Sequence, residues 1–172
     1  KPDQAYSNRL VDFVEKGDLM LTDLGYFKLS VFQQVTAKGA YFLSKLLIGT
    51  TLLNADTSEK IDLRATLRSF VGNTLEMNVI MGNDKHPVPC RLIGFRATKQ
   101  IADTRRRKLR KEAKKKGLTP SKNHLVLCDW TLFVTNVPSE ILPVTIVFSL
   151  YRLRWQIELI FKQLNPTSTN SS

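Results

Sequence analysis

The 172 residues of the chain, 42% hydrophobic and 24% charged, have the composition of an ordinary folded domain. Lysine and arginine outnumber aspartate and glutamate by 26 to 15, which gives a formal net charge of +11 at pH 7. This excess makes a polyanion the expected partner, with nucleic acid ahead of an anionic membrane surface. No apolar run reaches the roughly 20 residues of a spanning helix. Two cysteines and two histidines without ligand spacing argue against a zinc site or a disulfide framework.

The first 48 residues are predicted to alternate between helices and buried strands. Apolar spacing and glycine positions indicate helices over 3–15 and 28–37 and strands over 19–22 and 41–48. Asp23 follows the first strand directly and would lie where that strand opens into a loop. A carboxylate in this position is a candidate catalytic residue.

The pattern of polar and apolar residues changes over residues 49–128, where stretches of alternating polarity are typical of strands. The clearest stretches are 75–81 and 88–96, and turn signals lie at 82–84 and 87–89. We therefore expect a β-rich insertion over this segment.

A run of basic residues, 105–116, lies inside this segment and stops at Gly117. Its residues are good helix formers, but it has almost no apolar side, so it should not belong to the core. It forms either a solvated helix or loop, or an arm that contacts phosphates. The second alternative arises because like charges at this density repel one another unless a polyanion is near.

The last part of the chain is predicted to hold a strand over 130–135 and then a long helix. Ser139 can cap this helix, although Pro143 leaves its first residue open. At about 100° per residue, one side of the helix collects apolar residues that would pack against a sheet. These are Leu153, Ile157, Ile160, Phe161 and Leu164.

A second stripe of the same helix carries Tyr151, Arg154 and Glu158. Taken alone, Arg154 and Glu158 could be an ion pair one turn apart on a solvated face. Their spacing from Tyr151, however, resembles the Y-R-E-K signature of bacterial insertion-sequence transposases of the IS-four type, which are DDE enzymes. Residues 21–27, Leu-Thr-Asp-Leu-Gly-Tyr-Phe, resemble the segment around that family's second catalytic aspartate, and residues 41–45 resemble the strand after it.

The resemblance implies an α/β fold with a partial ribonuclease-H-like core and a β-rich insertion domain. The core would comprise residues 1–48 and 129–165, the insertion residues 49–128, and the tail residues 166–172. Members of the family cut and join DNA at the terminal inverted repeats of their element, with a site for two Mg²⁺ ions. A full-length member would act as a homodimer in the bacterial cytoplasm, associated with the nucleoid.

Carried over residue by residue, Asp23 and Glu158 would be catalytic carboxylates and metal ligands, because hard cations prefer carboxylate oxygens. Tyr151 and Arg154 would hold phosphates of the transposon end. Trp130 would stack on a flipped base, with the alternative that it simply packs beside its strand. The further candidates for binding DNA are Lys45, Arg105, Arg106 and Arg107.

The sequence departs from the family pattern in two places. Asn165 stands where the family has a lysine, and the sequence that follows suggests a truncation or a frame change near Gln163. The first catalytic aspartate has no candidate, since the aspartates before Asp23 lie too close to it; these are Asp3, Asp12 and Asp18. Because the chain also begins without an initiator methionine, we expect a fragment that does not catalyse as given. A nucleic-acid-binding module without catalysis and a nuclease of the same fold remain as alternatives.

Overall fold

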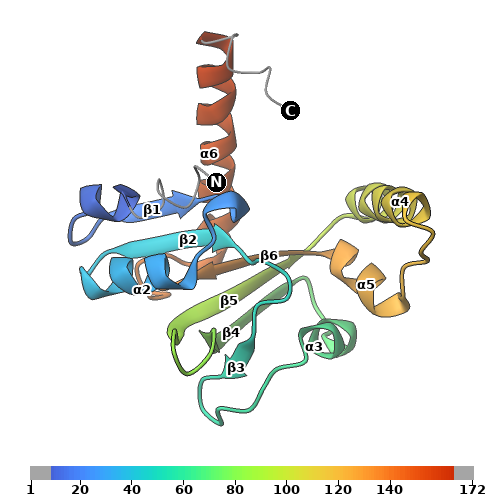
Figure 1. The fold of residues 1–172 in the computed structure, drawn as a ribbon, viewed down its shortest axis with the longest axis horizontal. Coiled ribbons are helices and arrows are strands. Elements are labelled where there is room, and N and C mark those ends of the chain that lie inside the picture. The colour runs from blue at the N-terminus through green and yellow to red at the C-terminus, as the bar shows by residue number, and fades with distance from the viewer. Residues whose placement is uncertain (1–8, 165–172) are drawn as a thin grey trace. The chain divides into compact units, whose positions relative to one another are not determined.

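The computed structural model describes the backbone of residues 9–164 and the side chains of residues 9–154 (Figure 1). The chain divides into two compact units, one ending at Asn136 and one beginning at Val137. Each unit is considered by itself below.

In the described part of the first unit, six strands form one sheet in the order β1-β2-β6-β5-β4-β3. β1 and β2 are parallel, and the other neighbouring pairs of this sheet are antiparallel. The protein is therefore mixed α/β, with a mostly antiparallel sheet. The strands are β1 (Leu19–Thr22), β2 (Tyr41–Lys45), β3 (Leu52–Asn54), β4 (Thr74–Met81), β5 (Val88–Arg96) and β6 (Trp130–Thr135).

The predicted strand, helix and strand after residue 18 are confirmed as β1, α2 (Leu29–Ala37) and β2. α2 forms because its apolar residues recur on one side, where Val31, Phe32 and Val35 are buried. The ring of Phe32 stacks on that of Phe42 in β2, with 4.4 Å between centroids. The second strand was predicted to reach residue 48 but ends at Lys45, because Thr50 closes a turn by donating its backbone N–H to the carbonyl of Leu47.

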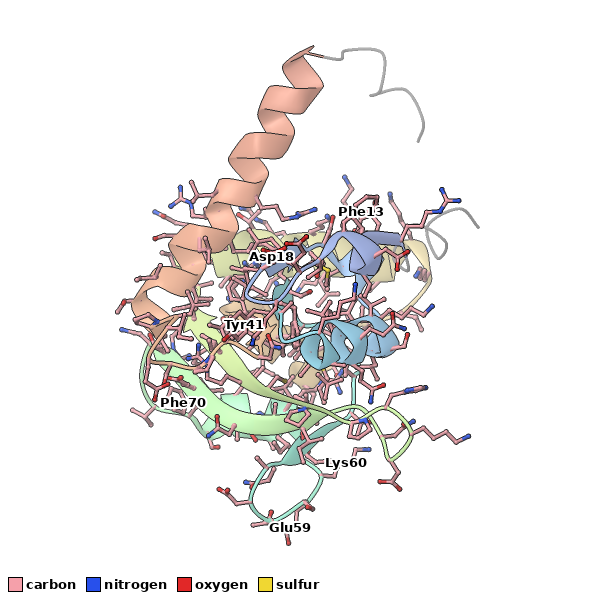
Figure 2. All side chains as sticks on the ribbon, turned by 90° about the vertical axis from the view of Figure 1, so that its left-hand side faces the viewer. Phe13, Asp18, Tyr41, Glu59, Lys60 and Phe70 are labelled. Carbon is pink, nitrogen blue, oxygen red and sulfur yellow. The ribbon has the colours of Figure 1, made fainter. Side chains whose placement is uncertain are left out.

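The helix predicted over residues 3–15 is described only from residue 9, and it ends at residue 13. Val11 is buried on its inner side, whereas Phe13 is 81% exposed (Figure 2). Two backbone bonds tie the following turn to the start of β2. Gly17 donates to the carbonyl of Gly39 over 3.0 Å, and Tyr41 donates to that of Asp18 over 2.8 Å.

The strands predicted at residues 75–81 and 88–96 are confirmed as β4 and β5. Besides the helix of the basic run, the same segment holds three short helices that the patterns of alternating polarity did not predict. They are α3 (Leu63–Ser69), α5 (Lys122–Val126) and the single turn η2 (Leu127–Asp129), which ends one residue beyond it. β5 pairs with β6 from Arg91↔Thr135 to Arg96↔Trp130, so the sheet continues from this segment into β6. The boundaries of an insertion domain stay a prediction.

The basic run forms the C-terminal two thirds of helix α4 (Lys99–Lys115), which begins at Thr98, whose hydroxyl accepts from the N–H of Ile101. Figure 1 shows α4 and α5 together at the end of the sheet where β6 begins. The expectation that the run lies outside the core is confirmed, because none of residues 105–116 is buried. The helix nevertheless has an inward side. Ala102 is buried, and Leu109 and Ala113 are half-buried, because the helix rests on η2.

In the second unit, helix α6 spans Val144–Leu164. Ser139 does not cap it. The helix begins after Pro143, because a proline disfavours helical backbone in the residue before it and lacks a hydrogen-bond donor itself. Leu153 was predicted to face the core, but it is 51% exposed, whereas Val147 and Tyr151, one turn apart, are buried.

Candidate functional site

Asp23 lies directly after β1, and its side chain is exposed. One carboxylate oxygen accepts from the N–H of Leu24, and the backbone carbonyl accepts from Tyr26 over 3.0 Å. These bonds make Asp23 the N-terminal cap of the single-turn helix η1 (Leu24–Tyr26). The cap fixes the backbone at the point where the strand ends, so the carboxylate is presented at a defined place.

Lys45 reaches the same edge of the sheet as Asp23. In the parallel register Thr22 lies opposite Ser44, so Asp23 and Lys45 are the next residues on neighbouring strands. The carboxyl ends of parallel strands meet at one edge, where ligands commonly bind in α/β proteins. The structure thus brings an acid and a base from separate sequence segments to one edge.

Asn136 holds the opposite end of β2, a role that no sequence pattern indicates. Its side-chain oxygen accepts from the N–H of Phe42 over 2.8 Å, and its amide donates to the carbonyl of Ala40 over 3.1 Å. The amide also donates to the hydroxyl of Thr36 over 3.1 Å. An asparagine after a strand is a common turn residue, so only the tertiary contacts distinguish it as a clamp between α2, β2 and β6.

Trp130 is only 3% exposed at the start of β6. Its ring meets that of Phe70 edge to face, with 5.7 Å between centroids, and the guanidinium of Arg96 lies 4.5 Å from its centroid. Its indole nitrogen is buried without a hydrogen-bond partner in the described structure. These contacts favour the alternative that Trp130 packs beside its strand, and stacking on a base stays a prediction.

Arg105 points into the protein from α4. Its guanidinium donates to the carbonyl of Trp130 over 3.0 Å, to the carbonyl of Cys128 over 3.4 Å and to the hydroxyl of Thr131 over 2.9 Å. The planar guanidinium presents several N–H donors in a fixed arrangement, and these three acceptors surround it. The ammonium group of a lysine could not make the same set of bonds. Much of the hydrogen-bonding capacity of Arg105 is therefore spent within the chain.

Arg106 is bound on the same side of α4. It pairs with Asp103 over 3.0 Å and with Asp129 of η2. Arg107, by contrast, is exposed, and it donates to the hydroxyl of Thr104 over 3.3 Å. Of the three arginines of α4 predicted to bind DNA, Arg107 thus keeps the most of its surface in water.

Tyr151, Arg154 and Glu158 lie on a single helix, as predicted, because α6 contains all three positions. Tyr151 is 3% exposed and Arg154 half-exposed. The side chain of Glu158 lies outside the described residues, as do the apolar side chains predicted between residues 157 and 164 and everything from Asn165 onward. At about 1.5 Å per residue, the stripe from Tyr151 to Glu158 is about 10 Å long.

Both thiols are buried, which disfavours their reactive thiolate form. Burial raises the pKa of Cys90 to about 12. Burial also raises the pKa of Cys128, although the charge of Arg106 acts in the opposite direction. A thiol protonated at neutral pH is a poor ligand and a poor nucleophile. Among the described residues no cluster of three acids, cysteines or histidines could hold a metal ion.

The family described as "Transposase DDE domain" matches residues 3–167, which is nearly the whole chain. The chain belongs to the DDE transposase family. The match covers both Asp23 and the helix with Tyr151, Arg154 and Glu158, so the resemblance inferred from these residues is confirmed.

Two curated relatives of this chain show the extent of the similarity. The transposase for insertion sequence element IS231B of Bacillus thuringiensis subsp. berliner is 30% identical over 93% of this chain and 37% of the relative. The transposase for element IS1151 of Clostridium perfringens is 31% identical over 94% of this chain and 38% of the relative. The chain thus spans little more than a third of the relatives' length.

No solved structure matches this transposase chain significantly. Among its described helices, none is both long enough and apolar enough to cross a membrane.

Proposed function

We propose that this transposase chain is part of a catalytic region that cleaves DNA at the ends of an insertion sequence and transfers the cut strand. The observation that carries the proposal is the presence of Tyr151, Arg154 and Glu158 on one helix in a chain that matches the DDE family from residue 3 to 167. The fold class that this family implies is ribonuclease-H-like, with residues 49–128 as an insertion.

Asp23 and Glu158 are proposed to bind Mg²⁺. The structure offers one test of the fit: the carboxylate of Asp23 is exposed at the end of strand β1, and carboxylate oxygens are the donors that Mg²⁺ prefers. When bound, a pair of such ions stabilises charge on the attacking and leaving oxygens of a phosphodiester. Two carboxylates provide fewer ligands than the family's three, so we expect little cleavage by this chain alone.

Tyr151 and Arg154 are proposed to bind phosphates of the element's ends, and Lys45 to add a cation beside Asp23. Arg154 suits this role because a guanidinium forms paired hydrogen bonds with phosphate oxygens. Tyr151 would donate only its hydroxyl, which is compatible with a buried ring. A homodimer acting on nucleoid DNA in the cytoplasm completes the proposal.

A second candidate is a nucleic-acid-binding module without catalysis. The observation in its favour is the basic surface of α4, which needs no metal site and no particular DNA sequence. Such a module would bind all duplexes equally, whereas the proposed function requires a preference for the ends of the element.

The binding of element ends tests the proposed function. We expect the chain to bind a duplex of the terminal inverted repeat, taken from the DNA that flanks its gene, at least tenfold more tightly than a scrambled duplex. Arg154→Ala should remove most of this preference, because it deletes a phosphate contact fixed in register. The matched controls are Arg152→Ala, an exposed arginine of the same helix, and Lys115→Ala, an exposed lysine of α4.

Both controls should change the affinity for the two duplexes by less than threefold. A chain without any preference for the ends, or equal losses in all three variants, would show a purely electrostatic binder.

Metal binding at Asp23 is tested with Mn²⁺, which takes the place of Mg²⁺ and broadens nearby NMR signals. We expect selective broadening of the amides of Leu24 and Gly25, and its loss in Asp23→Asn, which keeps a capping side chain. Asp56→Asn, another exposed aspartate, is the control. Broadening that persists in Asp23→Asn would remove Asp23 from the site.

A further inference from the structure

Helix α4 has two sides of different chemistry. The inward side is formed by residues at helical spacing: Ala102, Arg105, Arg106, Leu109 and Ala113. The outward side carries exposed cations, and four of them fall within about 100° of the helix circumference. We call these four, Arg107, Arg110, Lys111 and Lys114, the α4 ridge.

The inward arginines attach the helix to the rest of the first unit. Arg105 donates to two backbone carbonyls and one hydroxyl at the start of β6, and Arg106 pairs with Asp129 just before it. The helix is thereby fixed by its middle to the end of a buried strand. Its outward side has a defined direction, which a loosely tethered basic arm would not have.

The α4 ridge has no acidic partner. Among the described residues, no aspartate or glutamate lies within ion-pair distance of any of its four side chains, and only Arg107 makes a hydrogen bond, to Thr104. Cations three and four residues apart on a helix repel each other. This repulsion disfavours the free helix and is relieved when anions lie along the ridge.

The ridge has the dimensions of a nucleic-acid backbone. From Arg107 to Lys114 the helix rises about 10 Å, and the phosphates of one DNA strand follow at about 3.4 Å along the duplex axis. The ridge can therefore span about three phosphates. An interface with a protein would need an apolar centre, and a membrane surface would need apolar side chains beside the cations. The four ridge positions provide neither.

We propose that the α4 ridge binds the phosphate backbone of duplex DNA without regard to sequence, and that Arg105 and Arg106 position the ridge and do not touch DNA. This inference rests on the proposed function, because both take DNA as the partner. The surface that it assigns to DNA binding is separate from Asp23 and from helix α6. The inference also divides the basic run by role, which its composition alone does not.

The salt dependence of DNA binding tests the ridge. In the variant Arg107→Gln, Arg110→Gln, Lys111→Gln, Lys114→Gln, the slope of log K against log salt for a scrambled duplex should fall by about 3. The control removes four exposed cations elsewhere: Arg9→Gln, Lys16→Gln, Lys60→Gln and Lys85→Gln. Both variants lose the same net charge, and the control slope should fall by less than 1.

Equal changes of slope in the two variants would overturn the proposal, because net charge and not the ridge would then account for binding. The variants should fold, since every altered side chain is exposed, and circular dichroism verifies this. The preference for element ends over scrambled DNA should survive in the ridge variant. A chain that shows no such preference contradicts the proposed function and leaves the ridge test valid.

The positioning role of Arg105 has its own test. Arg105→Lys keeps the charge and loses the fork of donors, so it should lower the salt slope in the wild-type background and have no effect in the ridge variant. If it lowers the slope equally in both backgrounds, Arg105 itself contacts phosphate and the positioning role is wrong.

Discussion

Helices α4 and α6 differ in which residues they turn inward, and in neither helix does composition alone identify those residues. α4 is basic almost throughout, yet it turns two arginines inward and attaches them to η2 and β6. α6 is largely apolar, yet Leu153 is 51% exposed and the buried residues of the same region are Val147 and Tyr151.

In α4, hydrogen-bond acceptors at the contact account for the inward arginines. Near the middle of α4 the backbone carbonyls of Cys128 and Trp130 accept hydrogen bonds from the guanidinium of Arg105. An apolar side chain has no donor for these carbonyls. Charge patterning therefore identifies a basic helix, but it does not identify which cations are free to bind a ligand.

The largest expected effect concerns α6. Tyr151→Ala should lower the free energy of unfolding by about 3 kcal/mol, because it empties a buried aromatic position. Leu153→Ala, two residues away and half in water, should lower it by less than about 0.5 kcal/mol. Urea denaturation of both variants measures the contrast. A larger loss of unfolding free energy for Leu153→Ala than for Tyr151→Ala would mean that Leu153 faces the core, as the sequence predicted, and would contradict the contrast between α4 and α6.

The next effect concerns α4. Arg105→Met should lower the free energy of unfolding by about 2 kcal/mol, since it leaves carbonyls that a charged donor had satisfied. Lys108→Met, an exposed cation one turn away, should have an effect below about 0.5 kcal/mol. Equal effects in urea denaturation would mean that α4 has no inward side.

The smallest expected effect uses Cys128 as a reporter of how α4 is seated. Burial raises the pKa of this thiol, and the charge of Arg106 lowers it, so Arg106→Gln should raise the pKa further. Alkylation by iodoacetamide between pH 8 and about 9 should then be slower by a few-fold, because the thiolate reacts. Cys90 contributes little, as its pKa is about 12.

Arg110→Gln, whose charge acts more weakly on Cys128, should slow the alkylation less. Faster alkylation in Arg106→Gln would show that the helix detaches and exposes the thiol. That result would sharpen the comparison by making Arg106 the main attachment of α4.

Local patterns were sufficient for much of the fold. The strands at Leu19–Thr22 and Trp130–Thr135 were predicted to the residue, because short apolar runs between turn signals leave few alternatives. α3 and α5 were not predicted, since they are short and lie in polar segments without a clear period. The start of α6 was missed because Ser139 and Pro143 give competing signals.

The sequence by itself determined the family. The spacing of Tyr151, Arg154 and Glu158 and the residues around Asp23 can be recognised from the sequence alone. The tertiary structure alone decided how the polar residues are used. It placed Lys45 beside Asp23 through a parallel register and buried Trp130 between Phe70 and Arg96. It also separated the anchoring arginines of α4 from the ridge. The physical reason is that a pairing register and a hydrogen-bond partner belong to segments distant in the chain, which a local pattern does not contain.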